Sequence, residues 1–403
     1  MHLTAEEEAM LGGQQGEGVA LAMRVLVGQA RISVAPRLVE ITSAHVDSCL
    51  YHGQVSLDFA HRLVDLGAQV RVPTTLNVGS TDLIHPGLVR DRELADEGRE
   101  LMSAYVALGC TPTFTCAPYQ LPNRPGLGEH VAWAESNAIV FANSVLGART
   151  DRYGDFLDIC AAVTGRAPYA GLQTDEARRG TVVFDCRPLT DYLAEELAYP
   201  LLGHYVGSVA GAGIPVLLGL PADVSEDRLK ALGAAAASAG GVALFHVVGV
   251  TPEAPTDTDG LPTHVVDHGT LQAIRHQLSN SSGSLDAVSV GTPHASYAEC
   301  VRLAELVQTE PVKLPFYLST GRAIRDQAAE SGVLQTLEDG GVTVVVDTCT
   351  YVTAILQPSW KTVMTNSGKW AHYAPGNINV SAVLGSLEEC VASARAGRVV
   401  LDG

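Results

Sequence analysis

Residues 181–250 read TVVFDCRPLTDYLAEELAYPLLGHYVGSVAGAGIPVLLGLPADVSEDRLKALGAAAASAGGVALFHVVGV. This stretch contains three apolar, strand-like runs: TVVFDC, IPVLLGL and VALFHVVGV. Two segments with helical spacing, 189–206 and 226–239, separate them. Apolar runs alternating with helices are typical of parallel strands that helices cover on both faces. The stretch therefore predicts an α/β fold with parallel-rich sheets.

The same alternation extends to both ends of the chain. Toward the C-terminus, helical segments at 271–278, 297–307 and 323–331 alternate with the strand-like runs LDAVSVG, KLPFYLS and GVTVVVDTC. Toward the N-terminus, the predicted helices span about 4–26, 59–66, 87–108, 129–146 and 155–164, and the predicted strands span 38–41 and 69–72. Thr4 and Glu7 have the spacing of a capping box for the first helix.

The length of 403 residues favours several lobes around a cleft, because a single core stops growing at roughly 250 to 300 residues. We expect an N-terminal α/β lobe at 1–170 and a C-terminal α/β region at 171–403. Within the second region, a division into lobes at 171–285 and 286–403 is the alternative.

Composition excludes several classes of function. A net charge of −18 with only 26 Lys and Arg residues argues against nucleic-acid binding. No apolar run reaches the ~20 residues of a membrane helix, and the acidic start MHLTAEEEAML is unlike a secretory signal. We therefore expect a cytoplasmic protein. Its eight cysteines are spread along the chain, which favours reduced thiols or metal ligands over disulfides.

The segment 110–154, CTPTFTCAPYQLPNRPGLGEHVAWAESNAIVFANSVLGARTDRYG, mixes apolar residues with polar ones. Its polar members are Glu135, Ser136, Asn143, Ser144, Arg149 and Thr150. Polar groups need partners when they are buried, so we expect this segment to face a ligand.

Polar residues also follow several predicted strands. They occur in TSAHVDSCLYHG and PTTLNVGSTD in the N-terminal part, and in GTPH, STGR and DTC in the C-terminal part. Open parallel sheets bind ligands at the carboxyl ends of their strands, so we expect GTPH, STGR and DTC to line one crevice.

Several of the candidate site residues have both a functional and a structural interpretation. Cys116 and Cys349 are placed to bind a soft metal or an iron-sulfur cluster, or are small buried hydrophobes. Arg149 is suited to grip a carboxylate or phosphate, or to form an ion pair. His294 is suited to polarise a substrate hydroxyl, or is hydrogen-bonded within the fold. Lys369 beside Ser367 has the character of an anion clamp. The chain has no Walker loop, Rossmann glycine fingerprint, metalloprotease helix or nucleophile elbow.

A series of motifs resembles the large subunit of aconitase X over nearly the whole chain. In order, the motifs are TTLN, TFTCAPY, AWAESNAIVFANSVLGART, FHVVGVTPEA, GTPH, DTC and TNSGKWAHYAPG. The resemblance implies an aconitase-like α/β fold with an iron-sulfur cluster that acts as Lewis acid in a dehydration. It also implies a small swivel domain, which this sequence does not contain, so we expect a separate small subunit that supplies a serine as base.

The resemblance and the strand-end pattern together assign site residues. The catalytic candidates are Glu135, Ser144, Arg149, His294 and Lys369. The substrate-binding candidates are Ser43, His45, Thr74, Thr75, Asn77, Ser136, Asn143, Thr150 and Ser367. The metal ligands are Cys116 and Cys349, with Cys110, Thr292 or Cys300 as the third. Relatives commonly carry a cysteine before the Pro-His pair, where this chain has Thr292, so the type of cluster is left open.

Family substrates are cis-3-hydroxy-L-proline and mevalonate 5-phosphate. The shortage of cationic residues beyond Arg149, Arg152, Arg322 and Lys369 favours the amino acid, which would become a pyrroline carboxylate. Mevalonate 5-phosphate is the alternative substrate. A metal-binding or regulatory paralogue without catalysis is the alternative of another class.

Overall fold

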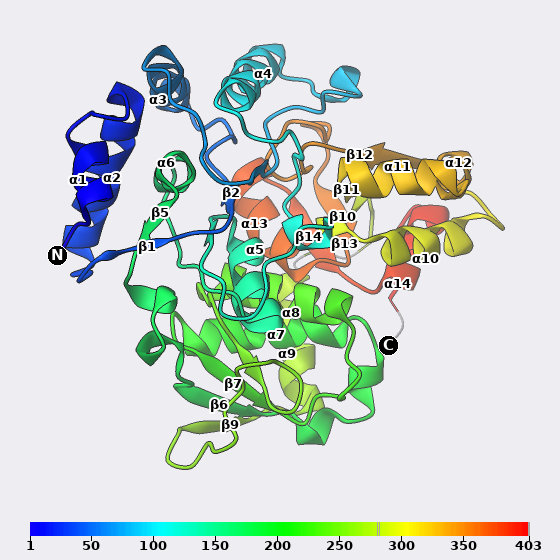
Figure 1. Ribbon diagram of the computed structural model, residues 1–403. Helices are drawn as coiled ribbons and strands as arrows, with labels where there is room; N and C mark the ends of the chain where they lie inside the picture. The colour runs from blue at the N-terminus through cyan, green and yellow to red at the C-terminus, as the bar shows by residue number, and fades with distance from the viewer. Residues whose placement is uncertain (280, 282, 402–403) are drawn as a thin grey trace. The chain divides into compact units, whose positions relative to one another are not determined.

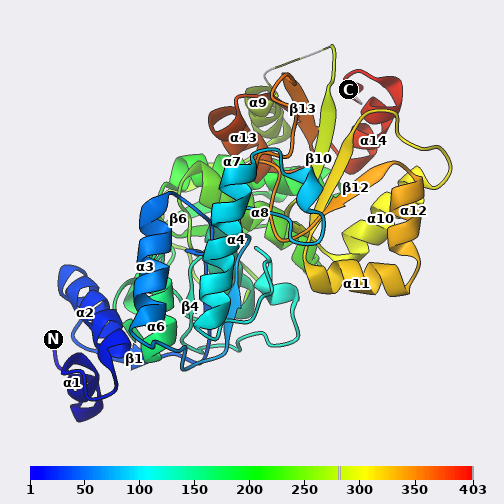
Figure 2. The same ribbon diagram turned by 90° about the horizontal axis from the view of Figure 1, so that it is seen from above.

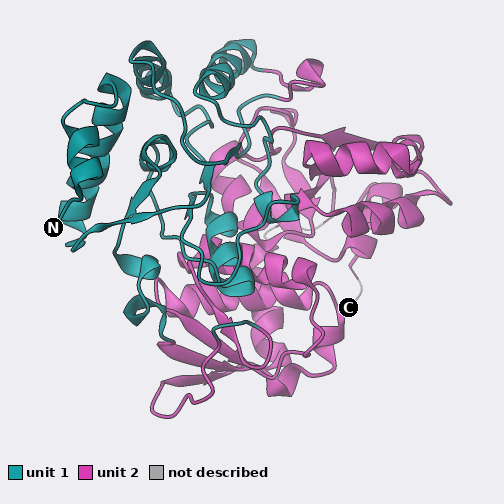
Figure 3. Cartoon of the chain, viewed as in Figure 1, with its two compact units in different colours: residues 1–81, 91–179, 251–253 teal, residues 82–90, 180–250, 254–403 magenta. Residues whose placement is uncertain are grey.

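A computed structural model describes residues 1–279, 281 and 283–401 of the chain. The chain divides into two compact units, which Figure 3 distinguishes by colour. Unit 1 comprises residues 1–81, 91–179 and 251–253. Unit 2 comprises residues 82–90, 180–250 and 254–403, of which 280, 282, 402 and 403 are not described.

Unit 1 is built on a three-stranded parallel sheet in the order β3-β2-β4. Its strands are β2 (Ala44–Val46), β3 (Thr74–Leu76) and β4 (Ala132–Trp133), and a separate antiparallel pair is formed by β1 (Leu38–Glu40) and β5 (Arg166–Pro168). The helices are α1 (Ala5–Leu11), α2 (Glu17–Ile32), α3 (Gln54–Asp65), α4 (Arg92–Ala107), α5 (Ser136–Phe141) and α6 (Leu157–Thr164). Helices α3 and α4 lie side by side, and α2 packs on α6 (Figures 1 and 2).

Unit 2 contains two parallel sheets. The first has the order β8-β7-β6-β9, with β6 (Val182–Asp185), β7 (Pro215–Leu218), β8 (His246–Val247) and β9 (Thr263–Val265). The second has the order β12-β11-β10-β13-β14, with β10 (Ala287–Ala295), β11 (Phe316–Thr320), β12 (Val342–Val345), β13 (Thr362–Thr365) and β14 (Ser381–Leu384).

Helices cover both sheets of unit 2. They are α7 (Ala198–Ala210), α8 (Glu226–Ala239), α9 (His268–Leu278), α10 (Tyr297–Val307), α11 (Arg322–Glu330), α12 (Val333–Asp339), α13 (Gly368–Ile378) and α14 (Leu387–Ala396). Helices α7 and α8 approach closely because Gly203 and Gly207 have no side chain. A Cβ on these residues would lie 2.1 Å from Leu232 O and 2.3 Å from Ala236 O, respectively.

The α/β class with parallel-rich sheets is confirmed, while several predicted element boundaries are wrong. The predicted helix 129–146 begins only at Ser136, because residues 132–133 pair as β4, and it ends in a π-helical turn at Ala142–Leu146. The predicted strand 69–72 lies further along, at Thr74–Leu76. The first helix breaks at Gly12–Gly16, where Gly13 and Gly16 have positive φ. The predicted helix 189–206 forms only from Ala198.

No helix within the described ranges 1–279, 281 and 283–401 is long and apolar enough to cross a membrane. The division at residue 170 stays a prediction.

Candidate active site

One face of the sheet in unit 1 carries polar side chains at the carboxyl ends of its strands. Side chains alternate along a strand, so His45 and Asp47 share a face, as do Thr75 and Asn77 on the neighbouring strand. On the other neighbouring strand of β2, which is β4, Trp133 pairs with His45, and Glu135 follows Trp133 by two residues. The predicted substrate-binding residues His45, Thr75 and Asn77 are therefore brought together with Glu135, whereas Thr74 lies on the opposite face.

His45 is fully buried and uncharged. Burial lowers the pKa of its imidazole to about 4, in spite of the negative charge of Glu135. Its Nδ1 lies 2.8 Å from the Thr75 hydroxyl, which itself lies 3.5 Å from the Ala44 carbonyl oxygen. If the Thr75 hydroxyl donates to that carbonyl, Nδ1–H donates to Thr75 and Nε2 is an acceptor. This Nε2 is buried and has no hydrogen-bond partner.

Asn77 joins the ends of β2 and β3. Its backbone N–H donates to Val46 O at 2.9 Å, and its side-chain Nδ2 donates to the Asp47 carboxylate. The side chain is only 2% exposed, and its Oδ1 has no hydrogen-bond partner. A buried acceptor without a partner costs about 1 to 3 kcal/mol, so such an atom points to a bound ligand.

Asp47 and Asp158 form an acidic pair that the sequence analysis missed. The Asp158 carboxylate accepts hydrogen bonds from the backbone N–H groups of Asp47 at 2.7 Å and Ser48 at 3.0 Å. Burial raises the pKa of Asp158 to about 6, against those hydrogen bonds. The pKa of Asp47 is raised to about 7, first by burial and then by nearby carboxylates. The sequence could have indicated Asp47, because it lies two residues after His45 and side chains at this spacing share one face of a strand.

Glu135 caps helix α5. Its carboxylate accepts from the Ala138 backbone N–H at 2.9 Å, the Ser136 hydroxyl at 3.1 Å and the Asn137 amide at 2.5 Å. A carboxylate at a helix N-terminus is stabilised in its charged form by the unpaired N–H groups there. The predicted catalytic residue Glu135 and the predicted substrate ligand Ser136 therefore contact each other.

The segment that follows α5 is held by Arg178, which the sequence analysis did not select. Asn143 Oδ1 accepts from the Thr150 backbone N–H at 3.0 Å and from Arg178 at 2.9 Å, and Arg178 also donates to Ala148 O at 3.1 Å. The Thr150 hydroxyl bonds both backbone groups of Trp133 at 3.0 Å. Asn143 and Thr150 thus position the Gly-Ala-Arg turn through contacts with the protein.

Arg149 forms ion pairs within unit 1. Its guanidinium lies 2.6 Å from Asp175 and 3.3 Å from Glu253. This is the structural interpretation that the sequence left open beside anion binding. Ser144, one residue after Asn143, is buried in the π-helical turn. The remaining predicted residue of unit 1, Ser43, precedes β2, and its carbonyl accepts from Ala132 N–H at 3.0 Å.

In unit 2, His294 and Cys349 are both buried. His294 lies near the end of β10, and its Nε2 is 3.2 Å from the Thr348 carbonyl oxygen. Because a carbonyl only accepts, Nε2 carries the proton, and Nδ1 is the nitrogen that can ligate a metal. Two buried hydroxyls nearby in sequence and sheet, on Thr292 and Ser319, have no hydrogen-bond partner.

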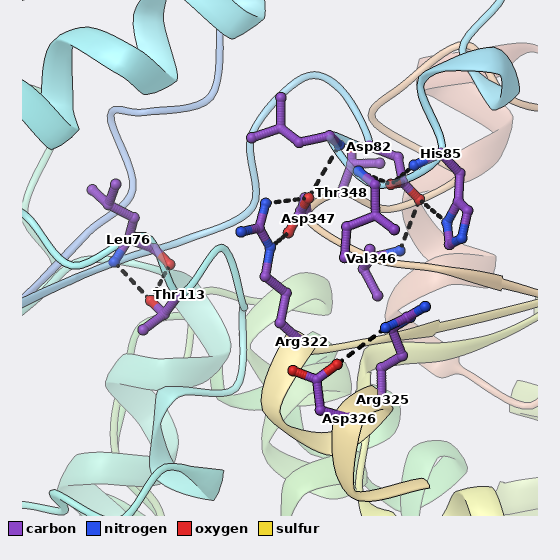
Figure 4. A network of polar contacts seen from close by, with 12 residues as sticks. Leu76, Asp82, His85, Thr113, Arg322, Arg325, Asp326, Val346, Asp347 and Thr348 are labelled. Carbon is purple, nitrogen blue, oxygen red and sulfur yellow. Dashed lines mark hydrogen bonds and ion pairs between the residues drawn. The ribbon is translucent and has the colours of Figure 1, made fainter. Parts of the chain in front are cut away.

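The Cys349 loop is anchored by the network in Figure 4. Asp347 has a positive φ of 65°, and its carboxylate accepts from Arg322 at 2.5 and 2.8 Å and from the Leu83 backbone N–H at 3.1 Å. Asp82 accepts from the Val346 and His85 backbone N–H groups at 3.1 and 2.7 Å. These two aspartates belong to the polar strand-end segments PTTLNVGSTD and DTC, and they fix the backbone that precedes Cys349.

Ser367 and Lys369 mark the start of α13. The Ser367 hydroxyl donates to the Thr292 carbonyl oxygen and accepts from the Trp370 backbone N–H at 3.0 Å, so it caps the helix. Lys369 is buried in the first turn of the same helix. The two predicted anion-binding residues are thus held beside the Thr292 loop.

Cys116, His294 and Cys349, all buried, form the group of side chains that could hold a metal ion in the described part of the chain. Two thiolates and an imidazole suit a soft metal or an iron-sulfur centre, so the donor set fits the expected cofactor. The third member of this group is His294, whereas Cys110, Thr292 and Cys300, the third ligands predicted from the sequence, are not part of it. Cys110 and Cys300 are buried outside this group, and burial raises the pKa of both thiols.

Parallel sheets with polar strand ends and a buried group of two thiols and an imidazole define the chain as an α/β protein able to bind a metal centre. Three protein-family models match the chain. They are described as the Aconitase X first domain, which matches residues 1–176, the second domain, which matches residues 180–276, and the third domain, which matches residues 285–396. The chain therefore belongs to the aconitase X family.

Similar proteins carry the names of dehydratases. Cis-3-hydroxy-L-proline dehydratase from Hypocrea jecorina is 40% identical, over 98% of this chain and 68% of that protein. The enzyme of the same name from Pseudomonas aeruginosa is also 40% identical, over 98% of this chain and 70% of that protein. The phosphomevalonate dehydratase large subunit of Thermococcus kodakarensis is 36% identical, over 93% of this chain and 95% of that protein.

The fold agrees with a solved member of the family. The crystal structure of Thermococcus kodakaraensis aconitase X in its holo-form superposes with a TM-score of 0.88 at 34% identity, covering 98% of this chain and all of that one. The predicted aconitase-like fold is confirmed, and the predicted enzyme class, a hydro-lyase, is that of the named relatives.

Proposed function

We propose that this chain is the large, catalytic subunit of an iron-sulfur-dependent dehydratase that converts cis-3-hydroxy-L-proline to a pyrroline carboxylate. The observation that supports it best is the buried group of Cys116, His294 and Cys349 in a chain of the aconitase X family. The choice of substrate is supported by 40% identity to proteins named for that substrate, against 36% for the Thermococcus protein named for phosphomevalonate.

In this proposal, Cys116, Cys349 and Nδ1 of His294 hold the iron-sulfur cluster. When bound, the cluster would supply a Lewis acid for the departing hydroxyl group. The protonated Nε2 of His294, hydrogen-bonded to the Thr348 carbonyl, orients the imidazole for this role. The buried hydroxyl of Thr292, two residues before His294, has no hydrogen-bond partner.

The reaction removes a proton from C2 and the hydroxyl group from C3 of the ring, and the hydroxyl leaves as water. The C2 proton is the more acidic because it lies beside the carboxylate carbon and the ring nitrogen. We assign Lys369 and Ser144 to the substrate carboxylate, whereas the single O–H of Ser367 is donated to the Thr292 carbonyl oxygen and this residue caps α13. Arg149 could join them only by giving up its ion pairs with the exposed Asp175 and the less exposed Glu253.

A separate small subunit is part of the proposal. The chain aligns with 95% of a relative named as a large subunit. We expect the small subunit to contribute the serine that removes the C2 proton. We also expect the complex to work in the cytoplasm.

Mevalonate 5-phosphate dehydration is the second candidate. It is supported by the large-subunit relatives that are named for phosphomevalonate, with which this chain aligns over nearly their whole length. Both candidate reactions would use the same metal-binding group. They differ in the polar side chains that are needed to bind the substrate.

Anaerobic co-purification of the chain with its small subunit, followed by iron and sulfide analysis and assays on both substrates, tests the proposal. We expect bound iron and sulfide and loss of one water from cis-3-hydroxy-L-proline. Iron-free, inactive protein after cluster reconstitution would instead favour a paralogue without catalysis, and Thr292→Cys would be the first variant to restore a third thiolate.

A further inference from the structure

The polar face of unit 1 offers acceptors to a ligand. Asn77 Oδ1 and, in the tautomer assigned above, His45 Nε2 are buried acceptors without hydrogen-bond partners. The Asp47 carboxylate, two residues after His45, is half-buried and accepts a hydrogen bond from the Asn77 amide. A ligand that satisfies these atoms must present N–H or O–H donors.

The same face is negatively charged. Glu135, Asp155 and Asp158 all act on Asp47 through their charges. Asp47 forms no ion pair with a Lys, Arg or His side chain among residues 1–279, 281 and 283–401. A carboxylate surrounded by like charges and without a countercation is a favourable site for a cation.

The two candidate substrates differ in whether they carry a positive charge. Cis-3-hydroxy-L-proline carries a secondary ammonium in its ring, which presents two N–H donors and a positive charge. Mevalonate 5-phosphate has a hydroxyl donor but no cationic group, and its phosphate and carboxylate carry the same sign of charge as this face. The negative charge of the face therefore favours the amino acid.

We propose that Asp47 is the counter-ion of the ring ammonium of cis-3-hydroxy-L-proline and that Asn77 Oδ1 accepts its second N–H. This inference rests on the proposed function and adds a residue that determines specificity. Asp47 therefore contacts the substrate at the nitrogen and sets the preference for an amino acid over a phosphate ester.

The proposal predicts that ligand binding releases protons from Asp47. The pKa of Asp47 is about 7, raised by burial and by Glu135, Asp155 and Asp158, with the Asn77 hydrogen bond opposing. The protonated thiol of Cys49 also interacts with Asp47, and His45, two residues before it, is neutral. An ammonium beside Asp47 lowers its pKa, so binding at pH 7 releases about half a proton, and much less at pH 8.5.

The test uses the iron-loaded complex and L-proline, which keeps the ammonium and carboxylate but has no hydroxyl to eliminate. Calorimetric titration in two buffers of different ionisation enthalpy measures affinity and proton release together. We expect wild type to release about half a proton at pH 7. Asp47→Asn should abolish the release and weaken binding on the order of 10 to 100-fold. Asp65→Asn, an exposed change at the end of α3, should match wild type.

Asp47→Glu provides a second variant that retains the charge, and it should keep part of the affinity and the proton release. Wild type that binds L-proline without proton release, or Asp47→Asn that binds like wild type, overturns the proposal. Failure of the proposed function is seen separately, as an iron-loaded wild-type complex that does not dehydrate cis-3-hydroxy-L-proline. Circular dichroism of each variant establishes that it is folded.

Discussion

At the scale of single residues, the site combines groups that the sequence revealed and groups that it did not. Cys116 and Cys349 stood out because thiolates bind soft metals and iron-sulfur clusters, and His294 stood out because its imidazole is suited to polarise a substrate hydroxyl. Asp47 did not, because an aspartate after a strand is normally a solvated turn residue. Asp158 did not either, because an aspartate in the first turn of a helix is ordinarily a surface residue. Only the tertiary structure shows that the Asp158 carboxylate is buried and bonds the backbone of the half-buried Asp47.

Replacing a ligand should remove the metal. We expect Cys116→Ser and Cys349→Ser to lose most of the bound iron, because a serine hydroxyl is a harder and weaker ligand than a thiolate. Cys110→Ser is the matched control: this cysteine is equally buried but outside the group, and its variant should keep its iron. Iron and sulfide analysis of the purified complexes measures the effect, and equal iron loss in all three variants would contradict the assignment.

The raised pKa of Asp47 predicts a dependence of stability on pH. The folded protein favours the neutral acid, so wild type should lose stability as pH rises from about 4 to 7, between the unfolded and folded pKa values. Asp47→Asn removes this cost and should raise the melting temperature at pH 8, by a gain of about 2 kcal/mol for a half-buried group.

Thermal unfolding of both proteins between pH 5 and 8.5 provides the check. A melting temperature of Asp47→Asn that falls with pH in parallel with wild type would show that Asp47 titrates normally. A variant that is more stable and binds its ligand less well would be typical of a residue retained for function.

At the scale of elements, the sequence pattern predicted type better than boundaries. Helices α8 and α10 coincide with the predicted 226–239 and 297–307, because each has an N-cap serine and a regular apolar face. The capping box of Thr4 and Glu7 is also confirmed. The predicted helix 129–146 was wrong at its start, because a two-residue strand is too short to leave a periodic pattern.

The glycines of α7 that face α8 allow the effect of helix spacing on stability to be predicted. Gly207→Ala should destabilise unit 2 by about 2 to 4 kcal/mol, because its Cβ would lie 2.3 Å from Ala236 O and the helices must separate. Gly28→Ala, within α2 and with open space around its Cβ, should instead stabilise by about 0.5 to 1 kcal/mol through helix propensity.

Differential scanning calorimetry of both glycine variants measures these effects. A melting temperature for Gly207→Ala at or above that of wild type would show that the close approach of α7 and α8 is not required.

At the scale of the whole molecule, regular alternation of strands and helices made the α/β class predictable, and the order of motifs made the family predictable. The metal group was only partly predictable, since its cysteines and histidine lie far apart in sequence and no spacing relates them. The candidate substrate residues were selected where strands end, because parallel sheets generally bind ligands there. Their hydrogen-bond polarity, which distinguishes an ammonium from a phosphate, required the structure.

The central claim is that this member of the aconitase X family dehydrates an amino acid. The most direct measurement compares kcat/KM of the iron-loaded two-subunit complex for cis-3-hydroxy-L-proline and for mevalonate 5-phosphate under the same conditions. We predict turnover of cis-3-hydroxy-L-proline with a preference of at least about 100-fold, corresponding to roughly 3 kcal/mol of difference in transition-state binding. Preferential turnover of mevalonate 5-phosphate would contradict the claim.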